Sequence, residues 1–417
     1  MNRRVAITGM AGISPIGNDW HSVRGRLEAY RNAVTRMPEW DEYDGLNTQL
    51  GAPAADFTLS ERYTTKATRS MGRVALMATR ASELALTDAG LLEDPLMRSG
   101  ELGIAYGSSA GTPKAICDFG KMIDEKSTRG INATTYIKMM GHTAAVNLGV
   151  FLGITGRIIT TSSACTSGSQ GIGYAYETIR AGRQRAMIAG GAEELCVTEV
   201  AVFDTLFATS VRNDAGGTTP RPFDAERDGL VLGEGAGALI LEEWEHARAR
   251  GARIYAEVVG FGTNSDGCQI THPSAGTMRI AKELALADAD LAAGAIGYVN
   301  AHGTGTQHGD IAESQATWSV LGRHAPVSSL KSYMGHTLGA CGALEAWISI
   351  EMMRARWFAP TINLTTDDPE CAELDYIIGA GRELDCEYIM SNNFAFGGIN
   401  TSLIFSKADQ QAAEKVL

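Results

Sequence analysis

Short runs of apolar and β-branched residues alternate along the chain with longer segments in which apolar residues recur every three or four positions. The short runs predict β-strands at residues 5–8, 103–106, 158–161, 186–189 and 238–241. The longer segments predict helices at residues 74–89, 165–181 and 244–250. Strands that alternate with helices are typical of parallel sheets covered by helices on both faces. The pattern therefore predicts an α/β fold.

The same order of elements recurs after about residue 250. Five segments of the first part resemble five segments of the second part in the same order, namely 4–12 and 254–262, 102–107 and 296–301, 158–181 and 327–353, 186–194 and 388–396, and 237–242 and 400–405. Repetition of this kind indicates an internal duplication. We predict two α/β halves, residues 1–250 and 251–417, each of which needs the other to fold.

Composition narrows the classes of function. The chain has 417 residues and a net charge of −12, with 44% hydrophobic and 20% charged residues, which is typical of a globular protein. An acidic balance argues against nucleic acid as the main partner, because phosphate binding needs clustered Lys and Arg. No apolar run is long enough to predict a membrane span. The first residues lack a secretory signal, and seven dispersed cysteines favour reduced thiols in the cytoplasm.

The segment TSSACTSG at residues 161–168 is the sharpest candidate for chemistry. An apolar strand ends there, and Cys165 begins a predicted helix that is rich in small residues. Free backbone N–H groups and the positive end of the helix dipole stabilise a thiolate at such a position. Cys165 is therefore a candidate nucleophile, and a small buried cysteine is the alternative interpretation.

Two further motifs follow predicted strands in the second half. The motif NAHGTGT at residues 300–306 contains His302, and the motif KSYMGH at residues 331–336 contains Lys331 and His336. Ligands of open α/β sheets bind at the carboxyl ends of the strands. Three strand ends that each supply a reactive side chain favour a catalytic site over isolated structural histidines.

Two other patterns carry less information. The segment NNFAFGG at residues 392–398 suits a mobile flap, but a buried glycine turn with core aromatics is favoured on this segment alone. The remaining histidines show no metal-ligand spacing, so we predict no metal site.

The motifs together resemble the β-ketoacyl-acyl-carrier-protein synthases of the thiolase-like fold, and most of all the KAS II branch. The matching segments are SACTSG, RPFDAERDGLVLGEGAG, VNAHGTGT, LKSYMGHTLGACGALEA, PTINL and NNFAFGGIN. They span nearly the whole chain. The resemblance implies a five-layered αβαβα architecture with two pseudo-symmetric halves, and a homodimer.

The resemblance also implies a reaction, the decarboxylative Claisen condensation of malonyl-ACP with an acyl chain in fatty acid elongation, where ACP is acyl carrier protein. It implies that Cys165 carries the acyl chain as a thioester. His302 and His336 are expected to stabilise the enolate. Lys331 is expected to pair with Glu345 and to order the site.

Other site residues follow from the same resemblance. The backbone N–H groups of Cys165 and Phe396 are expected to form an oxyanion hole, with Gly397 and Gly398 in a gating flap. Phe203 is expected to line the acyl pocket together with Phe396. Ala110 stands where the pattern usually has Ile, and it is expected to admit a longer or bulkier acyl chain.

No cofactor is implied to be required, and the substrates arrive on the phosphopantetheine arm of ACP. Some family members bind a monovalent cation, and the positions that match are Asn300, Glu345 and Asn392.

ACP is acidic, so a basic docking patch is expected. Lys66, Arg69 and Arg73 recur at helical spacing, although an ordinary solvated face is an equally good interpretation.

Several alternatives remain open. The sequence departs from the family pattern at Ala110, at Ala395 and at the pair Gln307–His308. A specialised synthase of a polyketide or aryl polyene pathway is therefore an alternative function. A thiolase-type acyltransferase needs a second cysteine as base, and the KAS III branch has Asn where this chain has His336. A non-catalytic partner subunit would lack Cys165. An active condensing enzyme is therefore favoured.

Overall fold

The computed structural model describes residues 2–268 and 270–408. Eleven of its described strands form one mixed sheet in the order β13-β11-β10-β15-β16-β9-β1-β8-β6-β4-β5. The first-half strands are β1 (Val5–Ile13), β4 (Leu102–Gly107), β5 (Ile158–Thr161), β6 (Ala186–Glu193) and β8 (Gly235–Glu243). The second-half strands are β9 (Ala256–Ser265), β10 (Ile296–Asn300), β11 (Pro326–Ser328), β13 (Asp375–Tyr376), β15 (Tyr388–Phe394) and β16 (Ile399–Lys407). Shorter strands pair outside this sheet, namely β2 (Thr35–Arg36), β3 (Leu50–Ala52), β7 (Leu232–Gly233), β12 (Trp357–Phe358) and β14 (Arg382–Glu383).

The sheet repeats its own order on the two sides of one junction. From the junction outward the strands run β1-β8-β6-β4-β5 on one side and β9-β16-β15-β10-β11 on the other. β1 and β9 join the two sides as an antiparallel pair in which Val5 lies opposite Val258. The five similar segment pairs of the sequence therefore occupy corresponding places. The division at residues 250 and 251 stays a prediction, and residues 409–417 of the predicted second half lie outside the described residues.

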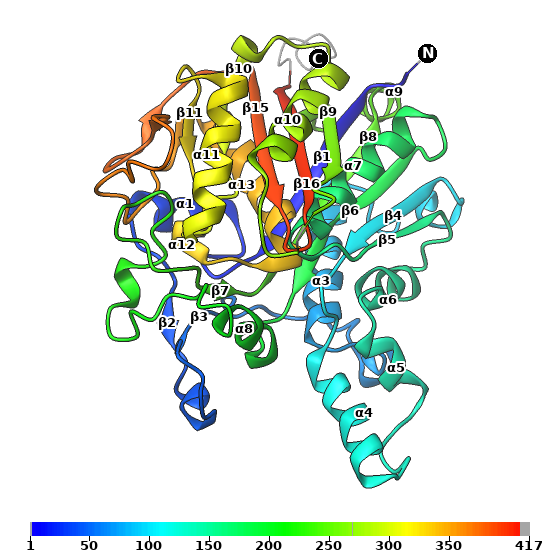
Figure 1. Ribbon diagram of the computed structural model, residues 1–417. Coiled ribbons are helices and arrows are strands. Elements are labelled where there is room, and N and C mark those ends of the chain that lie inside the picture. The colour runs from blue at the N-terminus through cyan, green and yellow to red at the C-terminus, as the bar shows by residue number, and fades with distance from the viewer. Residues whose placement is uncertain (1, 269, 409–417) are drawn as a thin grey trace.

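The helices are α1 (Trp20–Glu28), α2 (Thr65–Thr68), α3 (Arg73–Asp88), α4 (Pro113–Glu125), α5 (Ala133–Met139), α6 (Thr143–Leu152), α7 (Ser167–Arg180), α8 (Val197–Asp204), α9 (Trp244–Ala249), α10 (Ala275–Ala289), α11 (Gln307–Leu321), α12 (Lys331–Met334) and α13 (Cys341–Ala355). Six of these helices, α3, α6, α7, α10, α11 and α13, form three layers around the sheet. α3 and α6 pack on the first half, and α10 packs on the second half beside α11, while α7 and α13 contact both halves and each other (Figure 1). This arrangement gives the layer order α-β-α-β-α, and the predicted α/β fold class is confirmed.

The two central helices explain the position of the site. α13 is buried from Cys341 to Met353, as expected for a helix that packs against sheet on two sides. In α7 a Cβ atom at Gly171 would lie 2.7 Å from the carbonyl oxygens of Ala105 and Gly190, so only glycine permits this approach of helix and sheet. Both helices are preceded by short 3₁₀ turns that contact each other. Residues that lead into α7 and α13 therefore meet at one edge.

One predicted boundary is corrected at an important residue. The predicted helix 165–181 begins later, as α7 at Ser167, and Cys165 lies in the preceding 3₁₀ turn Ala164–Thr166. Ala164 adopts a left-handed conformation with φ of 49°, which interrupts the helix at this point. The other predicted strands and helices of the first half are present, and β1, β6 and β8 are longer than the apolar runs that predicted them.

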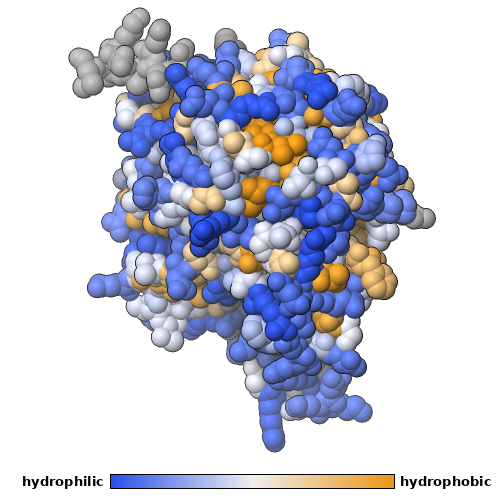
Figure 2. Space-filling view, turned by 90° about the vertical axis from the view of Figure 1, so that its left-hand side faces the viewer, coloured by the Kyte–Doolittle hydropathy of each residue, from blue (hydrophilic) through white to orange (hydrophobic). Residues whose placement is uncertain are grey.

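The surface agrees with the composition. The face shown in Figure 2 is mostly hydrophilic, and its apolar residues gather in small separate patches. None of the helices in residues 2–268 and 270–408 combines the length and the apolar character that crossing a bilayer requires. All seven cysteines are free thiols.

Candidate active site

Three predicted side chains meet at the edge where α7 and α13 begin. Cys165 comes from the turn before α7, His302 follows β10, and His336 lies between α12 and α13. The Cys165 Sγ atom lies 3.0 Å from His336 Nε2. The two imidazole rings meet edge to face with centroids 5.1 Å apart. One donor atom from each of the three residues lies within 4.8 Å of the other two, so one small group can contact all of them.

Neighbouring donors fix the hydrogen positions on both rings. The backbone N–H of Leu338 donates to His336 Nδ1 over 3.2 Å. The Lys331 ammonium lies 3.2 Å from His302 Nδ1, and an ammonium group can only donate. Both Nδ1 atoms therefore accept, and in the neutral rings the hydrogen is on Nε2. Burial first, and the Lys331 charge second, hold the pKa of both histidines well below the ordinary value. Two neutral N–H donors result.

Lys331 is held by a buried ion pair. Its Nζ atom lies 2.5 Å from Glu345 Oε1, and both side chains are fully buried. Burial raises the pKa of Glu345, and Lys331 opposes that rise. The other carboxylate oxygen accepts from the side-chain amides of Asn393 over 2.8 Å and of Asn300 over 3.3 Å. The predicted pair of Lys331 with Glu345 is present, with Asn393 as a further partner.

The candidate cation ligands are in part adjacent. Asn300 and Asn393 both donate to Glu345, and Asn393, which the sequence analysis did not name, joins the set. The role of Asn392, the next residue along β15, stays a prediction. The amide oxygens of Asn300, Asn392 and Asn393 are buried and accept no hydrogen bond from the described residues. Oxygen donors beside a carboxylate fit a hard cation, and these residues would hold one.

The cysteine thiol is neutral at rest. The backbone N–H groups of Phe396 and of Cys165 itself lie close enough to the sulfur to lower its pKa, but burial outweighs them and raises the pKa of Cys165 to about 11. The expected resting thiolate is therefore not supported, because burial disfavours the charged form of the sulfur. These two N–H groups are the ones expected to form the oxyanion hole, and that role stays a prediction.

The flap has the backbone that its glycines predict. Gly397 and Gly398 adopt φ angles of 96° and 77°, where glycine is favoured. Phe396 is partly exposed, and its ring meets that of Phe203 edge to face at 5.9 Å. Both rings line a cavity of about 590 Å³ that reaches Cys165, His302 and His336. This cavity connects the sulfur to the surface.

Ala110 is not among the residues that line this cavity. It is partly buried, and its N–H donates to Glu193 Oε1 over 3.2 Å. The structure therefore gives no support to its expected role in the acyl pocket.

The expected basic patch is not one helical face. Lys66 lies in α2, which ends at Thr68, and Arg73 begins α3. The helical conformation is interrupted between α2 and α3, so the side chains of Lys66 and Arg73 do not lie on one face of one helix. Arg73 also pairs with Glu234, with Nε 2.9 Å from Oε2. Of the three expected docking residues, Lys66 and Arg69 are exposed and do not pair with Glu234.

Buried carboxylates hold the loop that carries His302, and the sequence analysis did not single them out. Glu313 accepts from the backbone N–H groups of His302 and Gly303 over 2.8 and 2.7 Å. Asp310 accepts from those of Thr304 and Gly305 over 3.0 and 3.2 Å. The available signal was two acidic residues in the helix directly after a glycine-rich motif.

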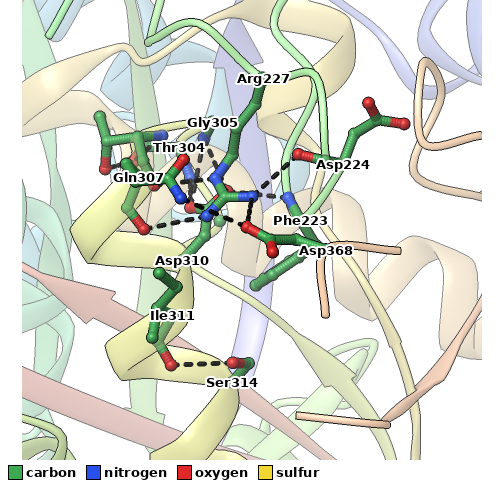
Figure 3. A network of polar contacts seen from close by, with 12 residues as sticks. Phe223, Asp224, Arg227, Thr304, Gly305, Gln307, Asp310, Ile311, Ser314 and Asp368 are labelled. Atoms are coloured by element: carbon green, nitrogen blue, oxygen red, sulfur yellow. Dashed lines mark hydrogen bonds and ion pairs between the residues drawn. The ribbon is translucent and has the colours of Figure 1, made fainter. Parts of the chain in front are cut away.

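Arg227 supports the same loop from the first half (Figure 3). Its fully buried guanidinium lies 2.6 Å from Asp368 and 3.6 Å from Asp310. It also donates to the backbone carbonyls of Thr306 and Gln307 over 3.2 and 3.0 Å. The loop therefore depends on an arginine that lies far from it in sequence.

The chain matches two family models. The model described as "Beta-ketoacyl synthase, N-terminal domain" matches residues 2–247, and that described as "Beta-ketoacyl synthase, C-terminal domain" matches residues 255–365. A curated 3-oxoacyl-[acyl-carrier-protein] synthase 2 of Vibrio harveyi is 38% identical over 97% of this chain and 99% of its own length. The corresponding protein of Synechocystis sp. is 37% identical over 97% of this chain and 98% of its own length.

Solved structures agree with these relatives. A β-ketoacyl synthase from Burkholderia phymatum STM815 has a TM-score of 0.96 and 59% identity, covering 98% of this chain and all of that one. The ishigamide ketosynthase/chain length factor has a TM-score of 0.87 and 30% identity, with the same coverage. A type II PKS ketosynthase, bound to the hexaketide and in complex with its acyl-carrier protein, has a TM-score of 0.86 and 30% identity, also with the same coverage.

The first prediction concerns Arg227. The Arg227→Met variant should lose about 3–5 kcal/mol of unfolding free energy, because it leaves Asp310 and Asp368 buried without their cation. Urea unfolding measures this loss. Arg248→Met, which removes a half-exposed arginine paired with Glu245, is the control and should change stability by less than about 1 kcal/mol. Equal stability of the two variants would contradict the proposed support of the loop.

Proposed function

The chain belongs to the β-ketoacyl synthase family, and we propose that it condenses malonyl-ACP with an acyl chain carried on Cys165 to give 3-oxoacyl-ACP and CO2. Membership of the family confirms the predicted class of enzyme, an acyl-transferring condensing enzyme. The observation that carries the detailed mechanism is the geometry at the sulfur. Cys165 Sγ lies 3.0 Å from His336 Nε2, and His302 lies within reach of both.

The first step is transfer of the acyl chain to Cys165. The sulfur attacks the thioester carbonyl of acyl-ACP. The carbonyl oxygen accepts hydrogen bonds from the backbone N–H groups of Cys165 and Phe396 as negative charge develops on it. The bond from that carbon to the carrier sulfur breaks. The thiol proton leaves with the carrier, so the products are acyl-Cys165 and ACP with a free thiol. His336 Nε2–H lies at the sulfur and favours its anionic form.

The second step is decarboxylation. The thioester oxygen of malonyl-ACP accepts from the Nε2–H groups of His302 and His336. The bond between the carboxylate and the α-carbon breaks, CO2 leaves, and the electron pair forms an enolate whose charge lies on that oxygen. Both donors are in place before the charge appears, so they need little reorganisation.

The third step forms the carbon–carbon bond. The enolate carbon attacks the acyl carbonyl on Cys165, whose oxygen again occupies the oxyanion hole. Cys165 leaves as thiolate and takes up one proton from water, which replaces the proton that left with the first carrier. No redox partner is needed in any of the three steps.

Cys341 argues against the thiolase-type alternative. Its Sγ atom lies 3.2 Å from the backbone carbonyl of Cys165, so it is engaged with the main chain. Burial raises the pKa of Cys341 well above the ordinary value. A thiol in this state is a poor general base, whereas two neutral imidazoles are present.

Elongation of fatty acids is the pathway that the curated relatives support. The solved polyketide ketosynthases, at 30% identity, keep a specialised pathway as the second candidate. ACP as carrier and a homodimer remain part of the proposal. The outer strand β5, with Ile158 exposed at 42%, supports an interface between two copies. A cytoplasmic location and a bound monovalent cation stay predictions.

The reaction itself tests the function. Purified chain incubated with acyl-ACP and malonyl-ACP should release CO2 and 3-oxoacyl-ACP, detected by mass spectrometry of the carrier. Product formed from acetyl-CoA alone would instead support a thiolase. Turnover that requires an added second subunit would support a partner role.

Replacement of the nucleophile separates the steps. Cys165→Gln should lower condensation by about 10⁴-fold or more and still release CO2 from malonyl-ACP, because both histidines remain. Mass spectrometry should show no acyl group on the variant chain. The exposed Cys117→Gln should behave as the parent. Condensation that survives in Cys165→Gln would remove Cys165 from the mechanism.

Loss of one donor should affect the second step. His336→Ala should lower decarboxylation by about 10²–10³-fold while acylation of Cys165 stays measurable, because the oxyanion hole is untouched. Release of labelled CO2 and the mass of the acyl-enzyme measure the two steps. His324→Ala, which removes an exposed histidine, is the control. An unchanged decarboxylation rate in His336→Ala would exclude this role.

A further inference from the structure

Lys282 is a buried lysine that the mechanism above does not use. It lies on α10, its side chain is completely buried, and its ammonium has no hydrogen-bond partner among the described residues. Burial of an ammonium without a hydrogen-bond partner costs free energy, because the charge loses its hydration. Another interaction must therefore offset this cost.

The compensation comes from two sides. The Lys282 Nζ atom lies 5.0 Å from the centroid of the Phe394 ring, which is within the range of a cation–π contact. The Glu313 carboxylate on α11 is the charge that favours the ammonium. Phe394 in turn lies edge to face with the His302 ring, with centroids 6.0 Å apart.

Glu313 and Phe394, the two neighbours of Lys282, both contact His302. Glu313 accepts from the backbone N–H groups of His302 and Gly303, and Phe394 packs against the imidazole. Lys331 approaches the same imidazole on its Nδ1 atom. His302 therefore lies between two ammonium groups, one in direct contact and one acting through Glu313 and Phe394.

We propose that Lys282 is a positioning residue for His302, because its ammonium lies over the Phe394 ring that packs against the His302 imidazole, and its charge favours the ionised form of Glu313, which holds the His302 loop. An ionised Glu313 is the stronger acceptor for the two backbone N–H groups. The proposal rests on the decarboxylation chemistry given above.

A dependence on pH follows. Burial lowers the pKa of Lys282 to about 8, and Glu313 opposes this shift. The ammonium is therefore present at neutral pH and is lost as the pH rises through about 8. Loss of the ammonium removes its cation–π contact with Phe394, which packs against His302, so decarboxylation should fall over this range. The titratable groups that face Lys282 or its partners are Glu313 and Asp310 from α11, His302 after β10, Lys331 from α12 and His336.

The test uses decarboxylation of malonyl-ACP by the Cys165→Gln chain, with and without Lys282→Met. The added substitution should lower kcat by up to about 100-fold with little change in KM, and it should remove the alkaline limb near pH 8. Arg279→Met on the solvent side of the same helix, where Arg279 pairs with Glu283, is the matched control and should change neither. A kcat within about twofold of the parent, with the alkaline limb retained, would overturn the proposal.

Two further measurements keep the test decisive. In the Cys165→Gln chain with Lys282 intact, a decarboxylation rate that stays constant from about pH 7 to about pH 9.5 would also overturn the proposal. NMR of isotope-labelled histidine at neutral pH should show a changed chemical shift of the His302 ring in Lys282→Met, because the Phe394 ring that packs against it loses its ammonium partner. This measurement needs no activity. An unchanged His302 resonance refutes the inference alone, whereas absent decarboxylation in the Cys165→Gln parent refutes the proposed function.

Discussion

The buried charge of Lys331 is the constraint on which the site depends. Glu345 holds the ammonium beside His302, and that charge, added to burial, lowers the pKa of both imidazoles of the site, so that both are neutral. A buried ion pair of this kind is weak evidence for stability. Its value lies in the site, because the ammonium fixes the His302 hydrogen on Nε2, while the Leu338 N–H does the same for His336.

The loops of the site are held by charge rather than by apolar packing. Asp310 and Glu313 on α11 accept from four consecutive backbone N–H groups, those of residues 302–305. Arg227 pairs with the Asp310 carboxylate, and the charge of Lys282 interacts with the Glu313 carboxylate. Backbone amides are good partners for a buried carboxylate because they cannot move away when the substrate enters. The arrangement gives His302 a fixed position on a loop that is rich in glycine.

The sequence predicted the parts of the site that follow from local pattern. Cys165, His302 and His336 each follow a strand, and parallel strands bring such ends together. The local pattern could not show contacts that tertiary packing decides. The fold brings Asn393 to Glu345, although the sequence analysis had not named Asn393. The break between α2 and α3 separated Lys66 from Arg73. Lys282 gave no local signal at all, since only folding shows that a lysine on an amphipathic helix faces Phe394.

Neutral histidines suit the chemistry better than charged ones would. A cationic pair beside the sulfur would attract the malonyl carboxylate in the ground state, and binding that is equally strong before and during the reaction gives no acceleration. Neutral N–H donors interact weakly with the thioester carbonyl and more strongly with the enolate oxygen, where the charge develops. Lys331 therefore disfavours protonation of both rings, and Lys282 adds to this effect at His302.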